Sequence, residues 1–175
     1  MYNLISQNCL SGGLYYFVHE PYGNPFIWTV IDFNSMLYLI KNWDSINFDN
    51  YELTKDDKWN FSIIIDNHVK VQYVHYKLNA NYKKPTKTGP GDICYCKIWE
   101  FINQKYIERL KRMKDRNIKP IFCICNFNTI YKDAIYTEEQ LQCLEKYENV
   151  KVLRGFETKE PRESAFAFYQ RYLRE

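Results

Sequence analysis

The chain has 175 residues, 46% of them hydrophobic, with only 6 glycines and 6 prolines. This composition excludes collagen-like, low-complexity and wholly disordered chains, and the length suits a single domain over residues 1–175. The net charge of +3 gives no overall field for a polyanion, so a nucleic-acid partner is not expected.

The aromatic fraction of 18% is unusually high, with 16 tyrosines, 11 phenylalanines and 4 tryptophans. Two explanations are open from the sequence. The rings can reflect an AT-rich genome, which also enriches Asn and Lys, or they can form a binding surface for sugars or bases.

No targeting or membrane signal is visible. Residues 1–6 lack a basic segment and a long apolar segment, and apolar runs such as residues 26–31 are far shorter than the roughly 18 to 20 residues that span a bilayer. We therefore expect a cytoplasmic protein without an integral membrane segment, whose six cysteines are reduced thiols.

In the first half of the chain, short apolar runs alternate with segments of helical spacing. The expected order is strand, helix, strand, helix, loop with a short strand, and hairpin, at residues 2–6, 14–18, 26–31, 32–43, 44–58 and 61–76. Asp32 or Asn34 can cap the second helix, and Asp66-Asn67-His68 is the expected turn of the hairpin.

In the second half, residues 79–92 are loop-like, and residues 93–116 predict the longest helix, with an apolar stripe and basic faces. The remaining expected elements are a buried strand, a helix, a short strand and a last amphipathic helix, at residues 121–125, 137–144, 150–153 and from Pro161 onward. Thr137 with Gln140 fits a capping box.

Alternation of strands and helices predicts an α/β fold. We expect a single-domain three-layer sandwich with a mostly parallel sheet, in which the 61–76 hairpin is the antiparallel part. No internal repeat or linker is visible.

The loop between the first strand and the first helix is the most informative candidate site. Cys9 lies there, followed by Gly12 and Gly13. A thiolate at a helix N-terminus is stabilised by the helix dipole, and backbone N–H groups around Leu10 to Gly13 can form an oxyanion hole. The structural alternative is a buried Cys9 beside a glycine packing contact.

A cysteine nucleophile needs a base, and the chain has three histidines. His19 lies near a turn and His68 at the hairpin tip, where exposure is expected. His75 lies at the end of a strand and is the preferred partner of Cys9, with a structural histidine as the alternative.

Two other groups of residues are candidate ligand-binding sites, one for a metal ion and one for an anion. Cys94 with Cys96 and Cys123 with Cys125 have a spacing that argues against zinc, so neither a metal nor a cofactor is expected. Arg109 and Arg112 lie one helical turn apart and could bind a phosphate or carboxylate, although a solvated helix face is the simpler interpretation.

Several segments resemble a bacterial family of unknown function whose members are often labelled exopolysaccharide biosynthesis proteins. The similar segments are residues 5–9 with Gly12-Gly13, 22–27, 74–77, the 97–112 helix, 120–125, 137–139 and 149–153. The resemblance implies a role in capsule or exopolysaccharide biosynthesis, with a carbohydrate or activated sugar as substrate.

The chain is also similar to a family of papain-like cysteine peptidases, through Ser6 and Cys9, residues 25–28 and His75. The Ser–Cys spacing is one residue short, and Tyr76 stands where many members have Asp. The resemblance implies that Cys9 and His75 form a nucleophile–base pair. Asn126 is the expected third member, which would orient the imidazole, because it directly follows the strand at residues 121–125. The expected substrate-binding residues are Asn8, Ser11, Gly12, Gly13, Trp28, Tyr76, Arg109 and Arg112.

Three functions are therefore open. The first is an enzyme of cell-surface polysaccharide biosynthesis, a cysteine-dependent acyltransferase or hydrolase. The second is a papain-like peptidase or amidase. The third is a non-catalytic glycan-binding or scaffold protein, for which Tyr15, Tyr16, Tyr22, Trp28 and Tyr76 would form a sugar platform.

Overall fold

The computed structural model describes residues 2–8, 10–19, 21–55, 61–73, 78–79, 84–85, 98–126, 132–154 and 161–174. Its helices are α1 (Leu10–Phe17), α2 (Phe33–Asn42), α3 (Ile98–Arg116), α4 (Glu138–Leu144) and α5 (Pro161–Phe168). Its strands are β1 (Leu4–Ser6), β2 (Thr29–Ile31), β3 (Tyr51–Lys55), β4 (Phe61–Ile65), β5 (Val69–Tyr73), β6 (Leu78–Asn79), β7 (Lys84–Pro85), β8 (Ile121–Cys125) and β9 (Val150–Leu153). Shorter helical turns are η1 (Trp43–Ser45), η3 (Lys132–Ala134) and η4 (Tyr169–Leu173).

The strands divide into a parallel and an antiparallel sheet. The parallel sheet has three strands in the order β1-β8-β9, and the antiparallel sheet has four in the order β2-β5-β4-β3. A further pair joins β6 to β7. The fold is therefore mixed α/β, as expected.

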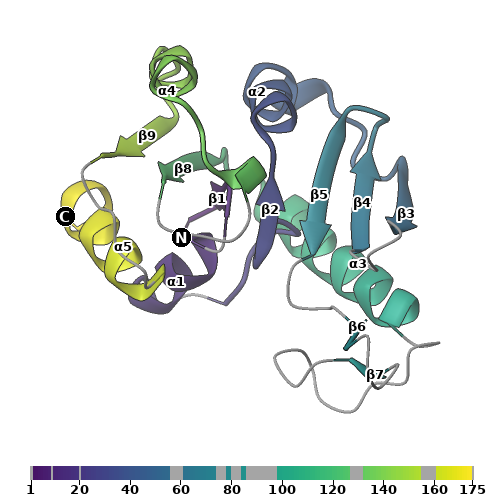
Figure 1. Cartoon of the computed structure of the whole chain (residues 1–175). Helices are drawn as coiled ribbons and strands as arrows, with labels where there is room; N and C mark the ends of the chain where they lie inside the picture. Colours follow the sequence, from purple (N-terminus) through teal and green to yellow (C-terminus); the bar gives the residue numbers. More distant parts are fainter. Residues whose placement is uncertain are drawn as a thin grey trace.

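The two larger sheets meet at a seam between β1 and β2, which lie beside one another in Figure 1. The backbone N–H of Ile31 in β2 donates to the carbonyl of Gln7, directly after β1, at 2.9 Å. The end of the parallel sheet is thus fixed against the edge of the antiparallel one.

Alternating residues of the parallel strands pack into two apolar clusters. Leu4, Cys123, Cys125 and Leu153 belong to a cluster with buried residues of α1 and α5. Their neighbours along the strands belong to a larger cluster that includes α2, α3, α4 and the antiparallel sheet; these neighbours are Ile5, Phe122, Ile124, Val150 and Val152. Burial on both faces explains why these strands are apolar runs.

The apolar stripe expected in the longest helix is confirmed. Ile102, Tyr106, Leu110 and Met113 of α3 are all buried. The Tyr106 hydroxyl donates to the carbonyl of Phe48 at 2.8 Å, and its ring lies 4.4 Å from that of Tyr51 in β3. These contacts place α3 against the antiparallel sheet (Figure 1).

Local signals predicted several element ends correctly. Asp32 caps α2 by accepting from the backbone N–H of Ser35, and Thr137 with Gln140 forms the expected capping box of α4. Asp66 and Asn67 have φ of 51° and 60°, as a tight hairpin turn requires. The short strand expected within residues 44–58 is β3.

Three expectations differ from the structure. Of residues 26–31 only Thr29–Ile31 form a strand, because Trp28 has φ of 60° and interrupts it. The loop-like 79–92 region includes β7 and the end of β6. The expected mostly parallel sheet is instead a parallel and an antiparallel sheet, because β2 and β3 pair antiparallel with the two strands of the hairpin and do not join the parallel strands.

Candidate functional site

The carboxyl edge of the parallel sheet is the candidate site. The three strands run in the same direction, so the residues that follow them, including Gln7, Asn8, Asn126 and Arg154, leave the same edge. In open α/β sheets, ligands bind beyond this edge. Helix α1 begins there at Leu10, immediately after Cys9 in the sequence.

Ser6 and Asn8 bind the end of β1 to its surroundings. The Asn8 side-chain amide donates to the carbonyl of Cys125 at 2.9 Å and accepts from the backbone N–H of Leu10 at 3.0 Å. The Ser6 hydroxyl donates to the carbonyl of Asn8 at 2.6 Å and accepts from the backbone N–H of Ser11 at 2.8 Å. The N–H groups of Leu10 and Ser11, two of the expected oxyanion donors, are therefore already used within the chain.

Two buried polar atoms at this edge have no hydrogen-bond partner among the residues that the structure describes. They are Nε2 of Gln7 and Oγ of Ser11, and both residues are 0% exposed. The amide oxygen of Gln7, Oε1, accepts from the backbone N–H of Cys125 at 3.4 Å. This bond places the side chain between β1 and β8. Leaving a buried donor unpaired costs about 1–3 kcal/mol, so such groups call for an explanation.

Trp28 lies against the start of α1 and directly precedes the β2 residue that pairs with the end of β5. A Cβ atom built on Gly12 would lie 2.5 Å from Cε2 of the Trp28 indole, so Gly12 is in close contact with this ring. The next residue, Thr29, is the register partner of Tyr73, the last residue of β5. Gly12 lies three residues after Cys9 and Tyr73 two residues before His75, so both segments flank one tryptophan.

Arg109 and Arg112 donate hydrogen bonds to the chain segment that leads to Trp28. Arg109 is 9% exposed, donates to the carbonyl of Ile27 at 3.2 Å and lies 5.7 Å from the Tyr22 ring centroid. Arg112 is exposed and donates to the carbonyl of Tyr22 at 3.2 Å. The structure thus gives both side chains a backbone partner, and their binding of a phosphate or carboxylate stays a prediction.

Asn126 follows β8 and is bonded to the backbone of Tyr136 at both ends of its side-chain amide. Its Nδ2 donates to the Tyr136 carbonyl at 2.6 Å, and its Oδ1 accepts from the Tyr136 N–H at 3.0 Å. These bonds fix the segment before α4. Whether Asn126 also orients His75 stays a prediction, because His75 lies outside the described residues.

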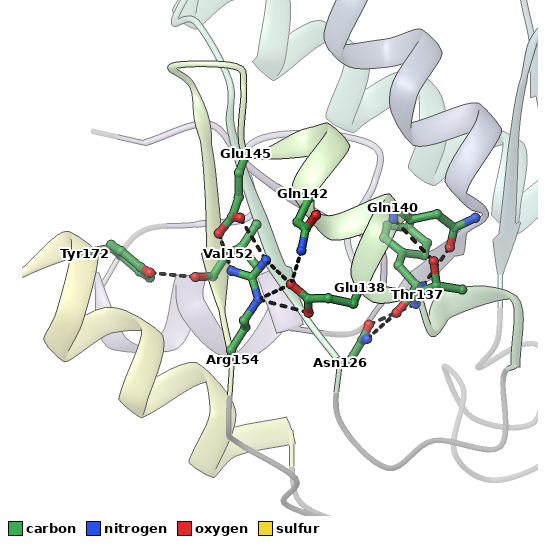
Figure 2. Close-up of polar contacts among 10 residues, drawn as sticks. Asn126, Thr137, Glu138, Gln140, Gln142, Glu145, Val152, Arg154 and Tyr172 are labelled. Atoms are coloured by element: carbon green, nitrogen blue, oxygen red, sulfur yellow. Dashed lines mark hydrogen bonds and ion pairs between the residues drawn. The ribbon is translucent and has the colours of Figure 1, made fainter.

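Arg154 follows β9 and lies between two carboxylates (Figure 2). One belongs to Glu138 at the start of α4, and the other to Glu145, which follows the last residue of α4. Its Nη2 is 2.9 Å from Oε1 of Glu138 and 2.8 Å from Oε2 of Glu145. Hydrogen bonds from Arg154 are the main cause that lowers the pKa of both carboxyl groups. On the neighbouring edge of β9, the Tyr172 hydroxyl donates to the carbonyl of Val152 at 2.6 Å.

The proposed nucleophile and base are not among the described residues. Cys9, His75 and Tyr76 all lie outside them. The other two histidines are exposed, as expected: His19 follows α1, and His68 lies in the hairpin turn, stacked 4.4 Å from Tyr38. Neither of these two histidines lies at the start of α1.

The buried cysteines of β8 have the properties of core thiols. Burial raises the pKa of Cys125 to about 11 and raises the pKa of Cys123 still further. Within the described part of the chain, no group of three or more His, Cys, Asp or Glu side chains could hold a metal ion. Cys94 and Cys96 lie outside that part.

The proposed sugar platform is wrong in one of its members. Tyr15 is 1% exposed, and its hydroxyl belongs to a buried network with the backbone N–H of Leu4 and the side chain of Asn24. Tyr16, on the other side of α1, is 72% exposed. Tyr22 and Trp28 are partly buried and contact each other edge to face at 6.4 Å.

Gln7 is the site residue that sequence reasoning missed. The signal in the sequence is an amide side chain directly after a buried strand, where the chain leaves the edge of the sheet. Gly13, expected to bind substrate, is buried within α1. Together, Gln7, Ser11, Gly12 and Trp28 define the described part of the candidate site.

No protein-family model matches the chain, and no curated protein matches it. Among the described residues, no helix combines the length and apolar character needed to cross a bilayer.

Proposed function

We propose that the chain is an enzyme that uses Cys9 and His75 for acyl transfer or hydrolysis. The observation that carries the proposal is the pair of buried, unpartnered polar atoms, Gln7 Nε2 and Ser11 Oγ, at the sheet edge where α1 begins. A polar atom that has no partner in the free protein is suited to bond to the oxyanion, because this group forms only when the substrate reacts. The contacts of Trp28 with Gly12 and of Thr29 with Tyr73 support an approach of the two segments that contain the pair.

The proposed reaction begins when His75 accepts the thiol proton and the Cys9 sulfur attacks a carbonyl carbon. The leaving group takes the proton from His75 as its bond to the carbonyl breaks, and a thioester remains. Water or an acceptor hydroxyl then attacks the thioester, and the thiol is restored. Gln7 Nε2 donates to the oxyanion, a role worth about 10²–10³-fold in rate.

The substrate class is part of the proposal and rests on the resemblance to exopolysaccharide biosynthesis proteins. An ester or amide on a polysaccharide precursor would be the acyl donor, and water or a sugar hydroxyl would be the acceptor. A papain-like peptidase would use the same pair on peptide bonds, so the substrate assay must contain both kinds of bond. We retain the three-layer sandwich as part of the same proposal. Helices α1 and α5 share an apolar cluster with one set of residues of the parallel strands, and α4 shares the other cluster with the alternate set.

The first experiment measures alkylation of Cys9 by iodoacetamide at neutral pH, read out by peptide mass spectrometry. We expect Cys9 in the native protein to react faster than in the urea-unfolded chain, and we expect His75→Ala to remove this advantage. His68→Ala is the matched control, because His68 is an exposed histidine of the hairpin turn. Equal rates in the native and unfolded chains would contradict the enzyme and leave the scaffold hypothesis.

The second experiment separates catalysis from structure at Gln7. Gln7→Met keeps the side-chain length and removes the unpaired donor, so we expect turnover of an O-acetylated saccharide or a peptide amide to fall about 10²-fold or more. The free energy of unfolding should change by no more than about 1 kcal/mol, because one long hydrogen bond is lost and one unpaired group is removed. Full turnover in Gln7→Met would exclude Gln7 as the oxyanion donor.

A further inference from the structure

A groove lies at the opposite edge of the parallel sheet, where β8 and β9 begin. It consists of two adjoining depressions of about 300 and about 480 Å³, which share Lys119, Pro120 and Asn149. Small-molecule sites in proteins usually have volumes of about 300–1,000 Å³. The groove is therefore large enough for a ligand, and it is separate from the candidate catalytic edge.

One wall of the groove is aromatic. Trp43, in η1 at the end of α2, lines the first depression and is partly exposed. The inner side of its indole packs on Phe48, Phe122 and Phe26, at centroid distances of 5.0, 6.1 and 6.3 Å. These buried rings hold the indole in place, so its exposed part is a fixed apolar surface.

The remaining lining offers hydrogen-bond donors and acceptors together. Lys41 and Lys119 donate, Asp44 and Glu148 accept, and Asn149 does both. Lys41 and Lys119 have no hydrogen-bond or ion-pair partner in the part of the chain that the structure describes. Donors of this kind are available to a ligand.

The charges of the groove largely cancel. Its three lysines, Lys41, Lys119 and Lys151, share the lining with the carboxylates of Asp44 and Glu148, and the C-terminal end of α2 adds a partial negative charge. A phosphate or other compact anion would find little net attraction here. A neutral ligand with many hydroxyl groups fits better, because each hydroxyl both donates and accepts.

We infer that this groove binds a neutral saccharide, with one sugar ring against Trp43 and its hydroxyl groups on Lys119 and Asn149. The inference is independent of the proposed acyl chemistry, which takes place at the other edge of the sheet. It concerns a different tryptophan from Trp28, the tryptophan of the sugar platform expected near Cys9.

The test is a titration of ¹⁵N-labelled protein with maltotriose, cellotriose and chitotriose, followed by backbone amide shifts. We expect at least one trisaccharide to shift the amides of residues 41–45, Lys119, Ile121 and residues 148–151 in a saturable manner. Lys119→Ala and Asn149→Ala should each weaken this binding about fivefold to tenfold, as the loss of one hydrogen bond predicts. Lys70→Ala, which removes an exposed lysine of β5, should leave it unchanged.

Two further arms complete the test. Inorganic phosphate that shifts the same amides, while no trisaccharide does, would overturn the inference in favour of an anion site. Absence of saturable shifts with all three trisaccharides would also overturn it. Cys9→Ala should bind the saccharide as the wild type does, so failure of the groove and failure of the proposed nucleophile are distinguishable.

Discussion

Gly12 and Trp28 are in such close contact that no side chain fits between them. A Cβ atom at Gly12 would lie 2.5, 2.7 and 2.7 Å from three atoms of the indole. The contact joins the first turn of α1 to the residue before β2, and Trp28 itself has φ of 60°. A bulky residue rarely adopts this backbone conformation, so the surrounding packing must hold it there.

We predict that Gly12→Ala destabilises the protein by about 1–3 kcal/mol, the usual cost of overpacking. The added methyl must displace the indole, which also packs near Val30 and Ala134. Urea denaturation measures the change. Tyr16→Ala, at the exposed position of the same helix, is the control and should change the free energy of unfolding by about 0.5 kcal/mol or less. Equal stability of Gly12→Ala and wild type would refute the close contact.

The two arginines of α3 should differ in their contributions to stability. Arg109→Met leaves the buried carbonyl of Ile27 without its donor, so we expect a loss of about 1–3 kcal/mol in the free energy of unfolding. Arg112→Met removes an exposed side chain whose carbonyl partner can turn to water, so its effect should be below about 1 kcal/mol. Denaturant titrations of both variants compare them directly. An Arg109→Met protein as stable as Arg112→Met would favour a ligand-binding role for Arg109 instead.

The contribution of Arg154 to stability should disappear in acid. The folded protein lowers the pKa of Glu138 and Glu145 below their ordinary value of 4.5, chiefly through hydrogen bonds from Arg154. A carboxyl whose pKa is lower in the folded state stabilises the protein above the unfolded pKa and loses this effect as the pH falls through the folded value.

We therefore expect Arg154→Gln to have a lower Tm than the wild type at neutral pH and the same Tm once the pH is below the folded pKa of both carboxyl groups. Because all three side chains are 38–54% exposed to solvent, the difference should also shrink in high salt. Arg174→Gln is the control, because Arg174 donates to the uncharged Gln170 and its replacement should show no such pH dependence. A Tm difference that persists at low pH would show that Arg154 acts through packing.

The cysteines give internal references for the reactivity of Cys9. Burial raises the pKa of Cys123 and raises that of Cys125 to about 11, so neither forms a thiolate near neutral pH. In native protein at pH 7.5 we expect both to resist alkylation until the chain unfolds, whereas the partly exposed Cys143 reacts. Peptide mass spectrometry after timed alkylation measures all of them at once. Rapid labelling of Cys123 in the native state would mean that β8 opens readily.

The sequence determined much of the local structure. The capping box at Thr137, the cap at Asp32 and the hairpin turn at Asp66-Asn67 depend on bonds and φ angles within a few residues, so short motifs predict them. The spacing of apolar residues likewise predicted the buried face of α3 and the strand at residues 121–125. Such periodic signals need no knowledge of the partner element.

Only the tertiary structure decided which strands share a sheet and which polar atoms lack a partner. The bond between Ile31 and Gln7 joins segments whose pairing no local motif encodes. The pairing of β2 and β3 with the hairpin strands, also between distant segments, divides the expected sheet in two. Asn8 and Arg109 resemble ligand-binding residues in the sequence, yet their bonds go to the carbonyls of Cys125 and Ile27. Gln7 became a candidate because hydrogen bonding is satisfied or unsatisfied only after distant segments meet.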